Sequence, residues 1–271
     1  MFAAMNAEGY VCYHEGMKVT VLGSGTSHGV PMIGCDCEVC TSNDLHDKRS
    51  RPSIALELPE GNILVDTSPE LRLQAVANGL KRVDAVLYTH THADHAHGID
   101  DLRAYNVRQG GAIPLYGSAL SMDDIRARFG YIFTPTWFGG GLPMLDLRPV
   151  DGPFEVLGRT VVPVTVLHGR LPVYGYRFGR FAYVTDCNAI PAESMDLLRE
   201  LDVLILDALR HREHPTHFNF EQALAVVADL RPGQTYFTHL THDILHRRDN
   251  MLLPPRVELA YDGLTMEVPE G

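Results

Sequence analysis

The segment 84–98 constrains the fold of this 271-residue chain more than any other stretch. It begins with the apolar run DAVLYT, which predicts a buried strand, and continues directly into THTHADHAHG, which holds four histidines and an aspartate. Because alternate residues of an extended chain point to the same side, His90 and His92 can share one metal ion. Asp94 and His95 follow in the turn that should begin a helix, where they are displaced toward a second ion.

Further ligands are expected where three later strand-like runs end. His168 ends VTVLH, Asp186 ends FAYVTD and His239 ends QTYFTH. With the four residues of the first segment, they make five histidines and two aspartates, which allow three ligands for each ion and one shared carboxylate. The sequence therefore predicts a binuclear metal site built from distant strand ends. His97 is interpreted as a bystander, and a histidine-rich surface loop is the alternative.

Strand-like and helix-like runs alternate along the whole chain, which predicts one α/β domain. A helix is expected to follow Ser68 as its N-cap, with Pro69 in the first turn, and to end at Gly79. The run FEQALAVVADL predicts another helix. No linker or repeat divides the chain, so the domain is expected to span 17–271, with 1–16 as a loose extension without an assigned role. Strands are expected at 18–24, 53–58, 62–66, 84–89, 160–167, 174–178, 181–186, 203–208 and 234–239.

Composition limits the classes of partner. Hydrophobic residues make up 45% of the chain, enough for a sizeable core, and no apolar run approaches the length needed to span a membrane. Without a secretory signal pattern either, a cytoplasmic location is expected. The formal net charge of −11 disfavours a nucleic-acid partner, because phosphate backbones are bound mainly by Lys and Arg. A small substrate is favoured instead.

A second cluster of possible ligands lies in GCDCEVC. Cys35, Cys37 and Cys40 place three thiols on a short loop, and His242 follows the expected ligand His239 by three residues. Three thiolates and one imidazole would complete a closed tetrahedral site for a structural zinc ion. Three reduced thiols without a metal are the alternative.

Together these motifs resemble the metallo-β-lactamase superfamily, whose THxHxDH motif is THTHADH here. The resemblance runs from residue 17 to about residue 268 and includes the turn DTSPE and the later THLTH. It implies an αββα sandwich, in which two facing sheets are flanked by helices and the site lies at one edge. It also implies that Asp66 orients the site without binding metal. By this pattern one ion is held by His90, His92 and His168, the other by Asp94, His95 and His239, and both by Asp186.

The cysteine loop, THLTH and THFNF together resemble the phosphoribosyl cyclic-phosphate phosphodiesterases of phosphonate breakdown. This resemblance implies a homodimeric hydrolase of a small cyclic phosphodiester, with two zinc or manganese ions in the active site. The expected catalytic residues are His217, which would assist at the phosphate, and the ligand Asp94. His214 is the alternative to His217, which is otherwise a surface histidine. Arg103 is a candidate for substrate binding.

Three alternatives remain. A ribonuclease Z would need a long tRNA-binding arm, and only 17 residues separate His168 from Asp186. The quinone-cofactor biosynthesis protein of the superfamily has a similar cysteine loop but a degraded metal motif. Third, the chain could bind a nucleotide or sugar phosphate without hydrolysing it.

Two further segments have features that are typical of binding sites. The segment GSGTSHG looks like a phosphate-binding loop, but it lacks the lysine of a P-loop and does not begin a helix, so it is interpreted as a tight turn. The aromatic segment YIFTPTWFGGG is interpreted as a substrate wall, a lid, a dimer contact or part of the core.

Overall fold

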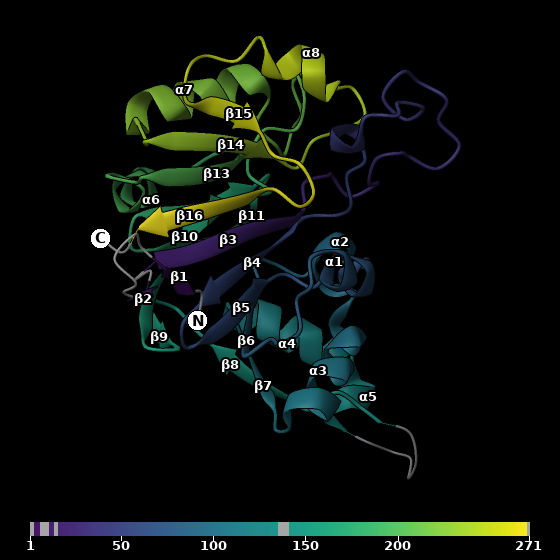
Figure 1. Cartoon of the computed structure of the whole chain (residues 1–271), viewed down its shortest axis with the longest axis vertical. Helices are drawn as coiled ribbons and strands as arrows, with labels where there is room; N and C mark the ends of the chain where they lie inside the picture. Colours follow the sequence, from purple (N-terminus) through teal and green to yellow (C-terminus); the bar gives the residue numbers. More distant parts are fainter. Residues whose placement is uncertain (1–2, 6–10, 14–15, 135–140, 270–271) are drawn as a thin grey trace.

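Two seven-stranded sheets face each other in the computed structural model (Figure 1). It describes residues 3–5, 11–13, 16–134 and 141–269. The first sheet has the order β16-β3-β4-β5-β6-β7-β8, and the second has the order β15-β14-β13-β12-β11-β10-β9. The strands of the first sheet are β3 (Gly16–Gly23), β4 (Ser53–Leu58), β5 (Gly61–Val65), β6 (Ala85–Leu87), β7 (Ile113–Gly117), β8 (Leu145–Pro149) and β16 (Thr265–Pro269). Those of the second are β9 (Phe154–Val156), β10 (Arg159–His168), β11 (Leu171–Phe178), β12 (Phe181–Val184), β13 (Val203–Asp207), β14 (Gln234–Thr238) and β15 (Val257–Leu259).

Helices cover the outer face of each sheet (Figure 1). Those near the first sheet are α1 (Leu71–Ala77), α2 (Ala93–Ala96), α3 (Arg103–Gln109), α4 (Ala119–Arg128) and α5 (Gly130–Phe133). Those near the second are α6 (Ala192–Leu197), α7 (Phe220–Leu230) and α8 (His246–Asn250). Two short 3-10 helices, Leu45–Asp47 and Ile99–Leu102, complete the helical segments of the described residues.

The apolar core consists of three main layers because the central strands are buried on both faces. In β13, Val203 and Ile205 pack between the sheets, whereas Leu204 and Leu206 pack under α7. The same alternation in β5 sends Leu64 toward the helices of the first sheet. A strand buried on both faces reads as an unbroken apolar run, which explains why these strands were predictable. The layers confirm the expected αββα sandwich.

Parallel pairing determines where the functional residues gather. Strands β5 to β8 are parallel in the first sheet, and β12 to β15 are parallel in the second. In parallel sheets all carboxyl ends lie at one edge, where α/β proteins commonly bind ligands. The residues that follow β5, β6, β12 and β14 are therefore brought to the same region.

The predicted starting point of the helix after Ser68 is wrong. The helix α1 begins at Leu71, and its N-cap residue Glu70 makes no capping bond through its side chain. The hydroxyl of Ser68 instead accepts a hydrogen bond from the Glu70 N–H, and its carbonyl accepts one from the Leu71 N–H. Ser68 thus closes a turn before the helix and does not cap it. The other predicted helix agrees with α7, which Asn219 caps.

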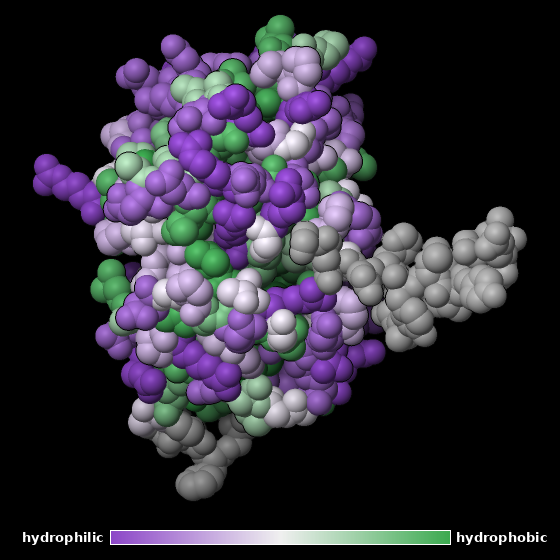
Figure 2. All heavy atoms as spheres, turned by 90° about the vertical axis from the view of Figure 1, so that its left-hand side faces the viewer, coloured by the Kyte–Doolittle hydropathy of each residue, from purple (hydrophilic) through white to green (hydrophobic). Residues whose placement is uncertain are grey.

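The described residues of the N-terminal extension, 3–5 and 11–13, form two short strands. Strands β1 (Ala3–Met5) and β2 (Val11–Tyr13) pair antiparallel as a small separate sheet, and β3 already begins at Gly16. Within the described residues no helix combines the length and the apolar character needed to cross a membrane. The face in Figure 2 is mostly hydrophilic, with apolar side chains in small groups.

Candidate active site

The predicted metal ligands and the supporting Asp66 meet at the edge formed by the carboxyl ends of the parallel strands. Asp66 follows β5, Asp186 follows β12 and His239 follows β14, each within two residues of the strand end. All three have positive φ, at 63°, 55° and 63°. Non-glycine residues rarely adopt this conformation, and it is concentrated at functional sites. The sharp turn at each strand end places an acidic or imidazole side chain at the common edge.

The first group of ligands contains three histidines. The Nε2 of His90 lies 2.9 Å from the Nδ1 of His92, and ligand atoms of these two and of His168 all lie within 4.8 Å of one another. The Nδ1 of His168 lies 2.9 Å from the Thr216 carbonyl, to which it donates. That bond leaves its Nε2 free of a proton, the form that binds a metal. The three rings can hold one ion.

All four members of the second group, Asp94, His95, Asp186 and His239, are buried. The Nε2 of His95 lies 3.1 Å from Asp186, and the Nε2 of His239 lies 3.3 Å from the same carboxylate. Neither Nε2 makes a hydrogen bond to any described residue. Buried polar atoms normally have partners, so the chemistry of this donor set fits a divalent cation.

Asp186 lies between the two groups. One of its oxygens is also within 4.8 Å of ligand atoms of His168 and His217. This position agrees with the bridging role that the resemblance implied, although binding itself stays a prediction.

The surroundings of His90 and His95 shift their pKa values in opposite directions. Burial lowers the pKa of His90, and the neighbouring His95 adds to the effect. Burial acts in the same direction on His95, but the carboxylates of Asp186, Asp94 and Asp66 outweigh it and raise its pKa. For Asp94, burial is outweighed by His95 and His239 together, which lower the pKa and keep the carboxylate ionised.

Asp66 contacts His95 and does not join either group. Its carboxylate accepts hydrogen bonds from the Nδ1 of His95 at 2.7 Å and from the backbone N–H and hydroxyl of Thr89 at 2.8 Å. These bonds fix the ring of His95 with Nε2 toward the centre. The contact agrees with the orienting role expected for Asp66.

His217 lies against the centre, together with a carboxylate that the sequence analysis missed. The Nδ1 of His217 is 3.2 Å from Asp207, whose other oxygen accepts the N–H of Phe218 at 3.1 Å. The ring of His217 stacks on His239 at 4.7 Å, and it meets His168 edge-on at 4.7 Å. Burial opposes protonation of His217, but Asp207 raises its pKa to about 9. Asp207 ends the buried run VLILD as Asp186 ends FAYVTD, a signal that could have found it.

The remaining candidates lie farther out. The ring of His214 is 5.1 Å from that of His217 and pairs with Thr216. Arg103 is half-exposed and contacts the Gly141 carbonyl at 3.1 Å and Asp100 at 3.7 Å, so its described contacts do not include the metal ligands. His97 is exposed, as expected of a bystander. Most of the aromatic segment, 135–140, lies outside the described residues.

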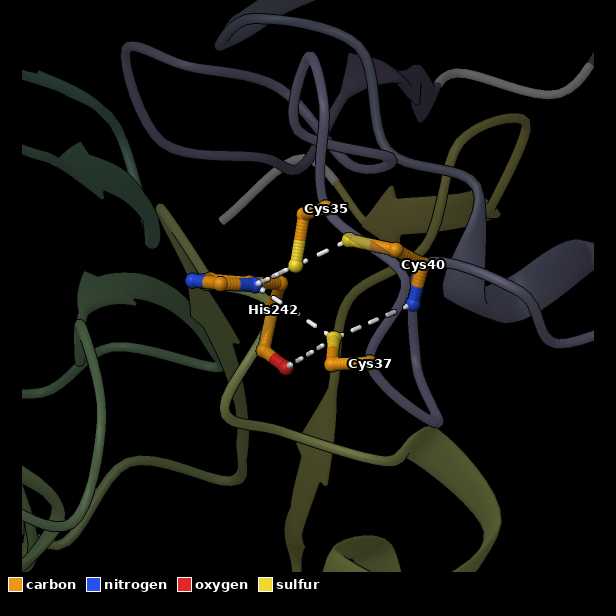
Figure 3. A group of neighbouring side chains, drawn as sticks. All are labelled: Cys35, Cys37, Cys40 and His242. Atoms are coloured by element: carbon orange, nitrogen blue, oxygen red, sulfur yellow. Dashed lines mark hydrogen bonds between the residues drawn. The ribbon is translucent and has the colours of Figure 1, made fainter.

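The cysteine loop and His242 form a separate cluster (Figure 3). The Nδ1 of His242 lies 3.2, 3.4 and 3.7 Å from the sulfurs of Cys35, Cys37 and Cys40. A tetrahedral zinc with bonds near 2.3 Å to sulfur and 2.0 Å to nitrogen separates such ligands by about 3.5 Å, so the spacing fits. The Cys40 N–H lowers the pKa of Cys37 to about 6, toward the thiolate that binds metal.

Comparison with known proteins identifies the relatives of this chain. The family model of the beta-lactamase superfamily domain matches residues 61–240. A crystal structure of a diphosphatase from the PhnP family superposes with a TM-score of 0.88 and 43% identity, covering 93% of this chain and 97% of that one. Zinc-bound PqqB from Methylobacterium extorquens superposes at a TM-score of 0.74 with 20% identity, covering 92% and 99%, and so shares the fold.

One curated relative has a different kind of name. An octanoyltransferase of Porphyromonas gingivalis is 41% identical over 259 residues, which are 94% of this chain and 52% of the relative. The chain therefore spans about half the length of this relative. Taken together, the family model and the diphosphatase indicate a hydrolase, and the superfamily fold implies divalent metal ions.

Proposed function

The chain belongs to the β-lactamase superfamily, and we propose that it is a metal-dependent phosphodiesterase with a binuclear centre that hydrolyses a small, cyclic phosphodiester. The main support is the complete set of seven ligands at one edge, with the pair Asp207 and His217 directly beside it. A set of this kind suits hydrolysis better than binding alone, because hydrolysis of a phosphodiester needs both a water of lowered pKa and a proton donor for the leaving oxygen.

Two divalent ions, zinc or manganese, would supply Lewis-acid stabilisation of the phosphate and a water of lowered pKa. The chain's own residues do the rest. Asp66 orients His95, and the Thr216 carbonyl orients His168. Asp207 holds the Nδ1–H of His217, so the Nε2 of His217 can carry the proton that a leaving oxygen requires. In the proposed reaction water attacks phosphorus and loses a proton, one ester P–O bond breaks, and His217 protonates the departing oxygen; the proton lost by water then restores His217.

The cysteine cluster is proposed to hold a structural zinc. Its four ligand atoms leave no position for substrate, as in closed zinc sites. It also joins residues about 200 positions apart in the sequence.

A small substrate is proposed in preference to tRNA. Between His168 and Asp186 the chain is occupied by β11 and β12, so this stretch does not form an arm. We further propose a cytoplasmic homodimer, following the resemblance found in the sequence. Octanoyl transfer is not proposed, because half of the relative that carries that name lies outside the match.

A substrate panel tests the proposal. Purified protein with its metals counted is assayed on bis(p-nitrophenyl) phosphate, a ribosyl cyclic phosphate, precursor tRNA, a lactone and a β-lactam. Metal-dependent cleavage of the two small phosphodiesters is expected, with negligible activity on the other three. Efficient trimming of tRNA, or a lactone as the best substrate, would contradict the proposal.

A further inference from the structure

The three histidines of the first ligand group differ in how their rings are held. The Nδ1 of His168 lies 2.9 Å from the Thr216 carbonyl. The Nδ1 of His90 lies 3.1 Å from the Thr89 hydroxyl. Among the described residues the ring of His92 makes a polar contact only with His90, itself an expected ligand. Metal-binding histidines commonly rely on a hydrogen bond from outside the centre for their orientation, so His92 needs a different support.

Helix α4 contacts Thr91, which lies between His90 and His92 in the sequence. The Thr91 hydroxyl donates to Oδ2 of Asp124, and the Thr91 carbonyl accepts from Nη1 of Arg128 at 2.9 Å. Arg128 also binds Asp124, with Nε 2.9 Å from Oδ1 and Nη2 2.9 Å from Oδ2. A guanidinium and a carboxylate joined by two parallel bonds form a planar unit of defined geometry. This unit contacts Thr91 at both its side chain and its backbone.

The fold brings α4 beside the turn that carries the ligands. Strands β6 and β7 pair in parallel, so the segments that follow them lie at the same edge of the sheet. The THTH segment follows β6, and α4 follows β7 after its N-cap Ser118, whose side chain accepts from the Ser121 N–H. Met122 and Ile125 pack in the core and anchor the helix. Residues 124 and 128 are one helical turn apart and therefore lie on the same face of α4.

We propose that Asp124 and Arg128 are positioning residues for the ion of the first group, acting through Thr91. A bond to the Thr91 carbonyl fixes the peptide plane that also contains the nitrogen and Cα of His92. The ring of His92 is then directed toward His90 without an outer hydrogen bond of its own. The inference rests on the proposed binuclear centre and deepens it, because it names the residues that set the affinity of one of the two ions.

A surface ion pair that only stabilises α4 is the competing explanation. The side chains of Asp124 and Arg128 are 29% and 44% exposed, and pairs this exposed contribute little to folding. A stabilising pair would change the melting temperature and leave metal affinity alone. A positioning pair would do the reverse, so the two explanations predict different measurements.

The experiment measures metal affinity and uses no substrate. Zinc-loaded protein is titrated with a chromophoric chelator of known zinc affinity, and the metal that remains bound is counted at each step, with the melting temperature recorded. Asp124→Ala and Thr91→Val remove the two ends of one hydrogen bond, and Thr91→Ser keeps the hydroxyl. Asp123→Ala, an exposed carboxylate on the same helix, is the matched control.

In Asp124→Ala and Thr91→Val one active-site zinc should bind roughly tenfold more weakly, the lower end of the effect of losing an outer partner of a ligand. The melting temperature should change little. The double variant should bind zinc no more weakly than Asp124→Ala, because the two changes break the same bond. Thr91→Ser and Asp123→Ala should match the wild type.

A second background identifies the ion. In His92→Ala the ligand that Asp124 positions is absent, so adding Asp124→Ala should cause no further loss of zinc affinity. A further loss there, or unchanged zinc affinity in Asp124→Ala itself, would overturn the proposal. Should Asp124→Ala fail to fold, Arg128→Ala replaces it and should weaken the same ion by a smaller factor.

Failure of this inference is distinguishable from failure of the proposed function. A wild-type protein that holds zinc only at the cysteine cluster would reject the binuclear centre together with the positioning role. Absence of phosphodiester cleavage would reject the proposed reaction and leave the measured affinities as they are, because no step of the titration uses a substrate.

Discussion

The two ligand clusters of this chain take His239 and His242, three residues apart in the sequence, yet the protein supports the two clusters in different ways. His239 belongs to the active-site cluster, whose ligands follow strands that the apolar core already holds in place. His242 belongs to the cysteine cluster, whose other ligands lie on the loop between β3 and β4. Around that loop the buried apolar residues are only Val30, Val39 and Cys40 among those described.

The difference suggests opposite dependences. The active-site cluster depends on the fold for its arrangement, whereas the fold around the cysteine loop is expected to depend on the cysteine cluster. The core orders the strand ends whether or not metal is bound, so loss of an active-site ligand should remove chemistry. The loop has little apolar burial of its own, so we expect its order to depend on the metal proposed to join it to His242. We therefore expect chemistry and stability to be lost separately.

The largest effect is expected from His239→Ala. Removal of a buried ligand should abolish turnover and weaken one active-site metal, while the melting temperature changes little because β14 remains packed. Turnover, metal content and thermal denaturation are measured. His97→Ala, an exposed histidine near the same centre, should retain activity. A large fall in the melting temperature of His239→Ala would contradict the expected difference between the two clusters.

His242→Ala and Cys37→Ser should affect stability first. Each should lose the same single metal and lower the melting temperature by roughly 10 °C or more, because structural zinc contributes folding free energy. Activity at low temperature should survive. Asp36→Ala, which changes an exposed residue between two cysteines, is the matched control. Full metal content and unchanged melting in both ligand variants would exclude a structural zinc.

Asp207→Asn and His217→Ala should reduce kcat with metal content unchanged. Loss of a general acid typically costs about 10²- to 10⁴-fold, and loss of the residue that positions it costs less. Because both act in one step, the double variant should be no slower than His217→Ala. Exposed Asp229→Asn is the control. If Asp207→Asn released metal, its role would be to support His239, whose Nδ1 lies 3.8 Å away.

The smallest effect is expected from Arg103→Ala. Its described contacts are with Asp100 and a backbone carbonyl, so kcat/KM should change less than about twofold, within the usual range for exposed ion pairs. The measurement uses the substrate preferred in the panel. A large rise in KM would restore Arg103 as the substrate ligand that the sequence suggested.

The comparison also explains how far the sequence could be interpreted. The central strands were predictable because burial on both faces gives continuous apolar runs. The short strands β1, β2, β7, β8, β9, β15 and β16 were missed. Two of these, β8 and β16, alternate with exposed polar residues and end in proline, so they read as loops.

The residues of the candidate site also divide into those that the sequence could predict and those that it could not. The ligands gathered in motifs were identified, whereas Asp207 was not, because its partner His217 reaches it only after the intervening segment folds back. A pocket of about 170 Å³ between residues 26–29 and the segment after β13 was not predicted for the same reason, because nothing in either segment points to the other.

The pairing of β16 with β3 has a consequence for synthesis of the chain. Thr265 pairs with Thr20 and Pro269 with Gly16, so the purple and yellow strands lie side by side in Figure 1. During translation, about 245 further residues must be added after β3 before its neighbour β16 exists. Until then the edge of β3 that pairs with β16 has unpaired hydrogen-bonding groups. Contacts between such distant residues form slowly. The first sheet therefore cannot be completed before Pro269 has been synthesised, and β3 stays open to mispairing until then.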